Sequence, residues 1–169
     1  MKHLTRCRIL VHLVDMFPAD GSDPVENLLS IVNELDVFSP TLALRERWLV
    51  LNKSDLISED EIDALKARIV DATGWKEDIH VISAVARQGT EHLCERLLTR
   101  LEHVWQAEKD DPELAEIESE NQQKMQSEAR ERIDALREQH RAKRKNIDIT
   151  EDDDEDEDDH DVEVVYVRE

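Results

Sequence analysis

The fold is decided by the stretch from Arg47 to Leu56, which reads Arg-Trp-Leu-Val-Leu-Asn-Lys-Ser-Asp-Leu. Its apolar run, residues 48–51, is rich in strand-forming side chains and ends abruptly in four polar residues, 52–55. A continuous apolar strand is typical of a parallel sheet covered on both faces, and such sheets place ligand-binding side chains just beyond the carboxyl ends of their strands. The stretch therefore predicts a buried strand that presents polar side chains to a ligand.

Asn-Lys-x-Asp at the end of a strand has the chemistry needed to read guanine. Guanine presents a ring N–H and an exocyclic amine side by side, and one ionised carboxylate, that of Asp55, can accept from both. The methylene stem of Lys53 can lie along the base, and Asn52 can tie together the loops beneath it. A turn with helix-capping residues would explain the same letters, so the motif needs support from its surroundings.

Two further apolar runs predict neighbouring strands. Residues 9–14 form a continuous apolar run that closes with Asp15, and residues 79–82 form a shorter one. Apolar residues at helical spacing separate the runs and predict helices whose inner faces include Val70 and Leu98. The helix start signals are Ser22 or Asp23 with Pro24, then Ser58, then Thr90. Alternating strands and helices predict an α/β fold, here a partial three-stranded parallel sheet with flanking helices.

The junction after the third run agrees with the first. Ser83 and Ala84 follow that run as Asn52 follows its own, and loops at the carboxyl ends of neighbouring parallel strands share one crevice. A backbone N–H near Ala84 could donate to guanine O6, which adenine lacks, and a small side chain lets the base approach. The predicted guanine-binding residues are Asn52, Lys53, Asp55, Ser83 and Ala84. We identify no catalytic constellation and no metal-binding cluster among the seven histidines.

Charge and cysteine content bound the class of protein. The net charge is −20, and residues 146–169 supply −12 of it from thirteen acids and one base. Such a chain does not bind nucleic acid through bulk charge, so any contact with RNA needs a local patch or a protein partner. Cys7 and Cys94 lie far apart without metal-ligand spacing, which favours a reduced, cytoplasmic protein. No apolar run approaches 18 residues, so no membrane span is expected.

The carboxyl-terminal third differs in composition. Residues 107–145 predict a long charged helix with few apolar positions and no coiled-coil seam. We expect this helix either to be exposed to solvent or to contact RNA phosphates at its basic end. Residues 151–159 are nine consecutive acids, expected to be disordered by self-repulsion, and act either as a solubilising tail or as an arm for basic partners. Residues 162–167 regain a short apolar pattern suited to adding to a partner's sheet edge. The expected parts are therefore 1–106, 107–145 and 146–169.

Taken together, these motifs resemble the carboxyl-terminal half of an Obg-type GTPase, a member of the P-loop GTPase superfamily. The likeness is carried by residues 3–15, 48–56 and 81–84 and by the acidic tail ending Val-Glu-Val-Val-Tyr-Val-Arg. The resemblance implies the second half of a P-loop GTPase domain, with guanine read by the five residues named above. It also implies slow Mg²⁺-dependent GTP hydrolysis, a role in large ribosomal subunit maturation with rRNA and ribosomal proteins as partners, links to growth and stress control, and a monomeric intact protein.

The sequence also departs from that family. Its three glycines form no Gly-Lys-Ser/Thr phosphate loop, which is needed to neutralise the phosphates of GTP. We therefore expect a fragment that holds the base-reading half of a site, binds neither GTP, GDP nor Mg²⁺ tightly alone, and leaves strand 9–14 as an open edge for partner pairing or aggregation. The alternative is a non-catalytic interaction module that acts through the charged helix and the acidic tail.

Overall fold

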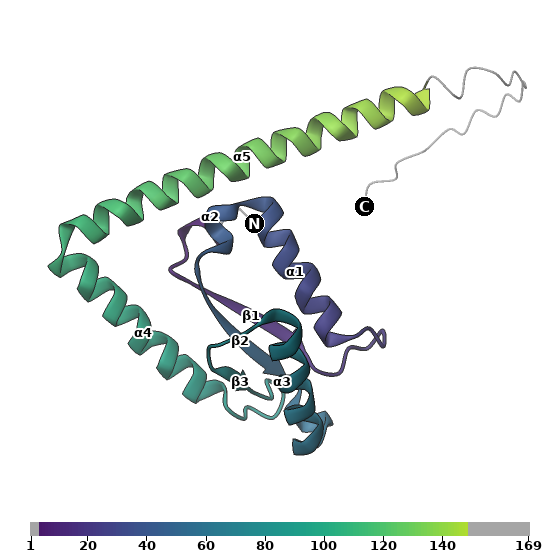
Figure 1. The fold of residues 1–169 in the computed structure, drawn as a ribbon, viewed down its shortest axis with the longest axis vertical. Helices are drawn as coiled ribbons and strands as arrows, with labels where there is room; N and C mark the ends of the chain where they lie inside the picture. Colours follow the sequence, from purple (N-terminus) through teal and green to yellow (C-terminus); the bar gives the residue numbers. More distant parts are fainter. Residues whose placement is uncertain (1–3, 149–169) are drawn as a thin grey trace, which may run out of the picture. The chain divides into compact units, whose positions relative to one another are not determined.

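The computed structural model describes residues 4–148 of the 169-residue chain. The chain divides into two compact units, residues 1–132 and residues 133–169. The first unit contains a parallel sheet with helices packed on it, and the long helix α5, Pro112–Asp148, begins there and continues into the second (Figure 1). The fold is therefore α/β with a three-stranded parallel sheet and flanking helices, as the sequence predicts.

The sheet has the strand order β1-β2-β3, and both pairs of neighbours are parallel. The strands are β1 (Ile9–Asp15), β2 (Glu46–Asn52) and β3 (Ile79–Val81). In the register of the first pair, Asp15 lies beside Asn52, and in that of the second pair Leu51 lies beside Val81. The carboxyl ends of the strands therefore meet at one edge of the sheet.

The helices begin and end where local chemistry dictates. Besides the start of α5, the first unit contains the helices η1 (Leu4–Arg6), α1 (Pro24–Phe38), α2 (Pro40–Ala43), η2 (Ser54–Leu56), α3 (Glu59–Thr73) and α4 (Thr90–Asp110). The predicted caps are present at Asp23, which accepts the Val25 N–H, and in the Ser58–Glu61 capping box. The expected cap at Thr90 is wrong, because Gly89 at φ +71° caps α4 and Thr90 is its first residue.

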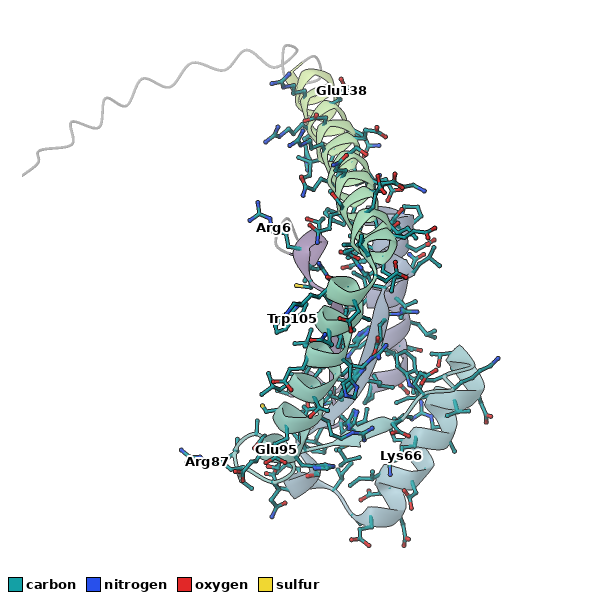
Figure 2. All side chains as sticks on the ribbon, turned by 90° about the vertical axis from the view of Figure 1, so that its left-hand side faces the viewer. Arg6, Lys66, Arg87, Glu95, Trp105 and Glu138 are labelled. Atoms are coloured by element: carbon teal, nitrogen blue, oxygen red, sulfur yellow. The ribbon has the colours of Figure 1, made fainter. Side chains whose placement is uncertain are left out.

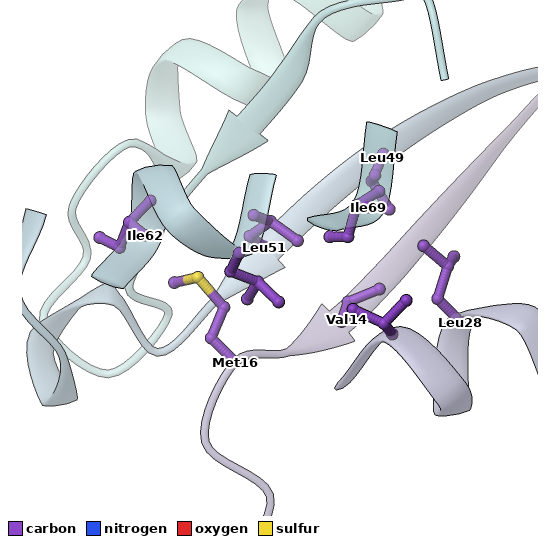
Figure 3. Close-up of a cluster of buried hydrophobic side chains, with 9 residues drawn as sticks. Val14, Met16, Leu28, Leu49, Leu51, Ile62 and Ile69 are labelled. Atoms are coloured by element: carbon purple, nitrogen blue, oxygen red, sulfur yellow. The ribbon is translucent and has the colours of Figure 1, made fainter. Parts of the chain in front are cut away.

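The main core lies between one face of the sheet and helices α1 and α3 (Figure 3). Its buried side chains are Val14, Met16, Val25, Leu28, Leu49, Leu51, Ile62, Leu65 and Ile69. Val70, which helical spacing predicts as buried, is 42% exposed. The reason is rotational, since Ile62, Leu65 and Ile69 already form the inward row of α3 and Val70 lies one position around the helix.

Helix α4 packs on the opposite face of the sheet, against β2 and the residues after β3. Val50, Ile82 and Leu93 are buried there. On β1 the same face is open, with Val11 45% and Leu13 54% exposed, because the apolar residues of α4 pack on Val50 and Ile82 and not on β1. Two larger apolar side chains of α4 also face solvent. Leu98, predicted on the inner face, is 54% exposed, and Trp105 projects outward (Figure 2).

The first part of α5 packs on the sheet unit through an apolar contact. Met125 is fully buried and Ala129 is 3% exposed. Met125 clusters with Leu10, Leu35 and Leu42 from β1, α1 and α2. The expectation of an exposed charged helix is therefore wrong around Met125, which joins a small hydrophobic cluster at the amino end of β1, whereas Leu114 and Ile117 of the same helix are exposed.

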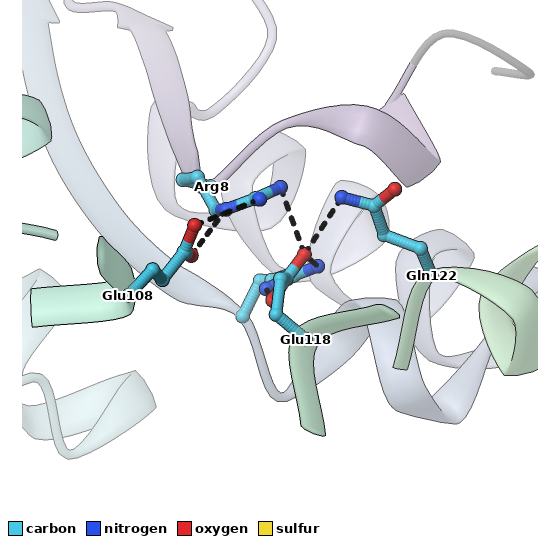
Figure 4. Close-up of polar contacts among 5 residues, drawn as sticks. Arg8, Glu108, Glu118 and Gln122 are labelled. Atoms are coloured by element: carbon cyan, nitrogen blue, oxygen red, sulfur yellow. Dashed lines mark hydrogen bonds and ion pairs between the residues drawn. The ribbon is translucent and has the colours of Figure 1, made fainter. Parts of the chain in front are cut away.

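Two carboxylates of α5 add polar contacts to the same interface. Glu118 accepts from Arg45 and forms an ion pair with Arg8 in which Nη1 and Oε1 are 2.9 Å apart (Figure 4). Glu128 accepts from the Ser39 hydroxyl at 2.6 Å and from the Thr41 hydroxyl at 2.9 Å, at the start of α2. Glu118 therefore contacts the residues just before β1 and β2, and Glu128 contacts the start of α2, which leads into β2.

None of the helices within residues 4–148 combines the length and the apolar character needed to cross a membrane. The acidic run 151–159 and the apolar segment 162–167 lie outside the described residues, as do the first three residues of the chain.

Candidate functional site

The loops after the three strands are joined by backbone hydrogen bonds. The Met16 N–H donates to the Asn52 carbonyl at 3.1 Å, which links the loop after β1 to the end of β2. The Ser54 N–H donates to the Ile82 carbonyl, also at 3.1 Å, which links the loop after β2 to the residues after β3. The polar residues predicted at separate strand ends therefore share one surface.

Two side-chain hydrogen bonds connect the polar cluster after β2 with the loop after β3. The Ala84 N–H donates to Asn52 Oδ1 at 3.0 Å. The Ser83 hydroxyl donates to Asp55 Oδ1, and Ser83 itself is fully buried. The Ser83 oxygen also accepts from the Ala86 N–H at 3.1 Å, which fixes the turn that follows β3. The expected proximity of Asn52, Asp55, Ser83 and Ala84 is confirmed, whereas their role in binding guanine stays a prediction.

Asp55 combines a fixed position with an open acceptor surface. It lies in the short turn η2, and its side chain is exposed to solvent. Ser83 engages only one lone pair of one carboxylate oxygen, and each such oxygen can accept two hydrogen bonds. Both oxygens therefore keep the capacity to accept from two adjacent donors on a ligand.

Lys53 adopts a backbone conformation that is uncommon for a residue with a side chain. Its φ and ψ are +73° and +37°, in the left-handed region. Its ammonium group contacts Asp15 Oδ2 at 2.6 Å and donates to the Phe17 carbonyl at 3.0 Å. The side chain thus runs from the end of β2 to the loop after β1, and its stem borders the surface that holds Asp55.

Sequence reasoning missed Asp15 and Phe17 as neighbours of this site. The available signal was the single carboxylate that closes the apolar run of β1, at the position that the register places beside Asn52. The structure also changes the expectation for Ala84. Its N–H, predicted to donate to guanine O6, already donates to Asn52, so a base must share or replace that contact.

The residues at this edge are an exposed carboxylate, a lysine side chain and the backbone amides of the loops. Within residues 4–148 no group of three or more His, Cys, Asp and Glu side chains is placed to hold a metal. None of the three glycines in the sequence is followed by Lys-Ser or Lys-Thr. The described surface therefore offers a carboxylate acceptor and a lysine stem beside the backbone amides of two loops.

No known protein-family model matches the chain. The interpretation of the site therefore depends on the geometry of its own residues.

Proposed function

We propose that this chain recognises the guanine base of GTP or GDP at the carboxyl edge of its sheet. The observation that carries the proposal is the pair of hydrogen bonds between the two loops, Ser83 to Asp55 and Ala84 to Asn52. These bonds hold a carboxylate and a small-residue backbone amide near each other, and guanine recognition needs both groups.

Selectivity for guanine over adenine follows from donor and acceptor patterns. Asp55 accepts from the guanine ring N–H and from its exocyclic amine, whereas adenine has an unprotonated ring nitrogen and no amine at the equivalent positions. The Ala84 N–H, where the base shares or replaces its contact with Asn52, favours a purine with an oxygen rather than an amine at position 6. Adenine therefore leaves acceptor oxygens of Asp55 without donors and brings its own amine against a donor.

The affinity of this surface for a free nucleotide is expected to be low. A few hydrogen bonds contribute about 1 kcal/mol each, and a ligand loses several kcal/mol of translational and rotational freedom on binding. The dissociation constant for GDP is therefore expected to be millimolar or weaker. By the resemblance to Obg-type GTPases, we propose that phosphate-binding residues outside this sequence add the remaining affinity, with Mg²⁺-dependent GTP hydrolysis and large ribosomal subunit maturation as activities of the intact family member.

The proposal is tested by nuclear magnetic resonance on the isotope-labelled full chain. GDP and ADP are titrated separately to millimolar concentration while the amide signals of residues 52–55 and 83–84 are followed. We expect GDP to shift these signals with saturation and ADP to shift them only weakly. The variant Asp55→Asn is expected to lose the GDP response, because an amide cannot accept from both guanine donors.

Asp60→Asn is the matched control, because Asp60 is an exposed carboxylate in the first turn of α3 and its loss changes the net charge by the same amount. This variant should bind GDP like the wild-type chain. Equal responses to GDP and ADP in the wild-type chain would contradict guanine recognition. That result would favour the alternative hypothesis, a non-catalytic interaction module that acts through the charged helix and the acidic tail.

A further inference from the structure

Lys53 is held by contacts that do not involve a ligand. Its ammonium group lies 2.6 Å from Asp15 Oδ2 and 3.0 Å from the Phe17 carbonyl oxygen. Asp15 is itself fixed, because its other oxygen, Oδ1, accepts the Phe17 N–H at 2.9 Å. One carboxylate therefore closes its own turn with one oxygen and binds Lys53 with the other.

These contacts act on a residue with an unfavourable backbone conformation. A left-handed φ of +73° is disfavoured for a residue with a Cβ and persists where surrounding contacts compensate for it. The ammonium contacts to Asp15 and Phe17 lie at the far end of the same residue. They supply the compensation that keeps Lys53 in place at the end of β2.

The pairing also decides which part of Lys53 is available to a nucleotide. An ammonium group already neutralised by Asp15 offers little charge to a phosphate, whereas the methylene stem remains free to lie along a base. The lysine side chain is 31% exposed and that of Asp15 is 39% exposed, so both border the open surface. Fixing the stem before a base arrives removes part of the entropy that binding would otherwise cost.

We propose that Asp15 is a positioning residue that holds the Lys53 stem against the guanine base and keeps its ammonium group away from phosphates. The proposal rests on the proposed guanine recognition by Asp55. It adds a residue of β1 to a site otherwise built from the loops after β2 and β3, so that all three strands contribute to base binding.

The test uses Asp15→Asn in the full chain, because an asparagine can still accept the Phe17 N–H through its amide oxygen and so preserves the local turn. In the wild-type chain with isotope-labelled lysine, a hydrogen-bonded ammonium group gives a signal protected from solvent exchange. We expect the Lys53 ammonium signal to be present in the wild-type chain and lost in Asp15→Asn. The GDP affinity of the variant should fall about threefold to tenfold, as for loss of one partly exposed charged contact.

Asp36→Asn is the control for net charge, since Asp36 is an exposed residue near the end of α1. Asp15→Glu is the rescue variant, and it should recover part of the Lys53 signal and part of the GDP affinity. The proposal is overturned if Asp15→Asn keeps the Lys53 signal, or if it loses the signal while binding GDP as tightly as the wild-type chain does. A wild-type chain that fails to discriminate the two nucleotides contradicts guanine recognition itself, and the Lys53 signal still reports separately whether Asp15 holds the lysine.

Discussion

Replacing Glu118 by Gln is expected to destabilise the sheet unit, because this carboxylate joins the starts of two strands. Arg8 immediately precedes β1 and Arg45 immediately precedes β2. Glu118 binds both, with Arg8 Nη1 at 2.9 Å from Oε1 and Arg45 Nη1 at 2.5 Å from Oε2 (Figure 4). A single residue of α5 therefore links the residues just before β1 and β2, at the end of the sheet opposite the candidate site.

The magnitude follows from burial. The side chains of Glu118, Arg8 and Arg45 are only 10%, 19% and 12% exposed. Breaking a fully buried ion pair costs roughly 3–5 kcal/mol, chiefly because the remaining charge is left without a partner. Arg8 keeps its bond to Glu108 at 2.7 Å, and glutamine can still accept one hydrogen bond. We therefore expect the free energy of unfolding to fall by about 2–3 kcal/mol.

Urea unfolding of the full chain, followed by circular dichroism and tryptophan fluorescence, measures this change. Glu116→Gln is the matched control, since Glu116 lies on α5 two residues away and is exposed. That variant should differ from wild type by less than about 0.5 kcal/mol, as is usual for surface substitutions. If Glu118→Gln were as stable as Glu116→Gln, the ion-pair reasoning would be refuted.

Three further outcomes follow from the structure. Burial opposes ionisation of Glu118, but hydrogen bonds from Arg45 and Gln122 and the charges of Arg45 and Arg8 lower its pKa below the ordinary 4.5. The stability that Glu118 contributes should therefore be present above pH 4.5 and lost as the pH falls through the lowered pKa. The difference in free energy of unfolding between wild type and Glu118→Gln should accordingly disappear on acid titration. Gly89→Ala should lower the free energy of unfolding, measured in urea, by about 1–3 kcal/mol, because φ is +71° and the new Cβ would lie 2.8 Å from the Val81 carbonyl oxygen. In Gly74→Ala the new Cβ meets no atom within 4 Å, so that variant should lose less stability. Fluorescent GDP at micromolar concentration should show no saturable binding to the chain in a polarisation titration, and tight binding would contradict the weak affinity expected of a base-only surface.

Local sequence signals predict the strands and most helix ends of the sheet unit. An apolar run such as residues 48–51 favours a buried strand of a parallel sheet. Ser58 and Glu61 satisfy the unpaired backbone N–H groups at the start of α3 within one turn. The polar cluster at Asn52 and the Ser83–Ala84 junction could be placed together because parallel strands share their carboxyl edge. These inferences depend on neighbours in sequence or on a general rule of topology.

The docking of α5 could not be predicted in the same way. Glu118 meets Arg45, a residue 73 positions earlier, and nothing in its own surroundings separates it from the many solvent-exposed carboxylates of that helix. Met125 is one apolar residue in a polar helix, and its burial depends on a cluster formed by three other elements. Asp15 was missed for a related reason, since its contact with Lys53 depends on strand register and on the left-handed backbone of the lysine.

Exchange of guanine for xanthine tests the central claim most directly, because xanthine replaces the exocyclic amine of guanine by a carbonyl oxygen. Binding of GDP and of xanthosine diphosphate to wild type and to Asp55→Asn is compared by the millimolar titration described above. If the Asp55 carboxylate reads the base, wild type prefers GDP, whereas the variant, whose amide both accepts and donates, prefers xanthosine diphosphate. An Asp55→Asn chain that keeps the wild-type preference for GDP would contradict the account.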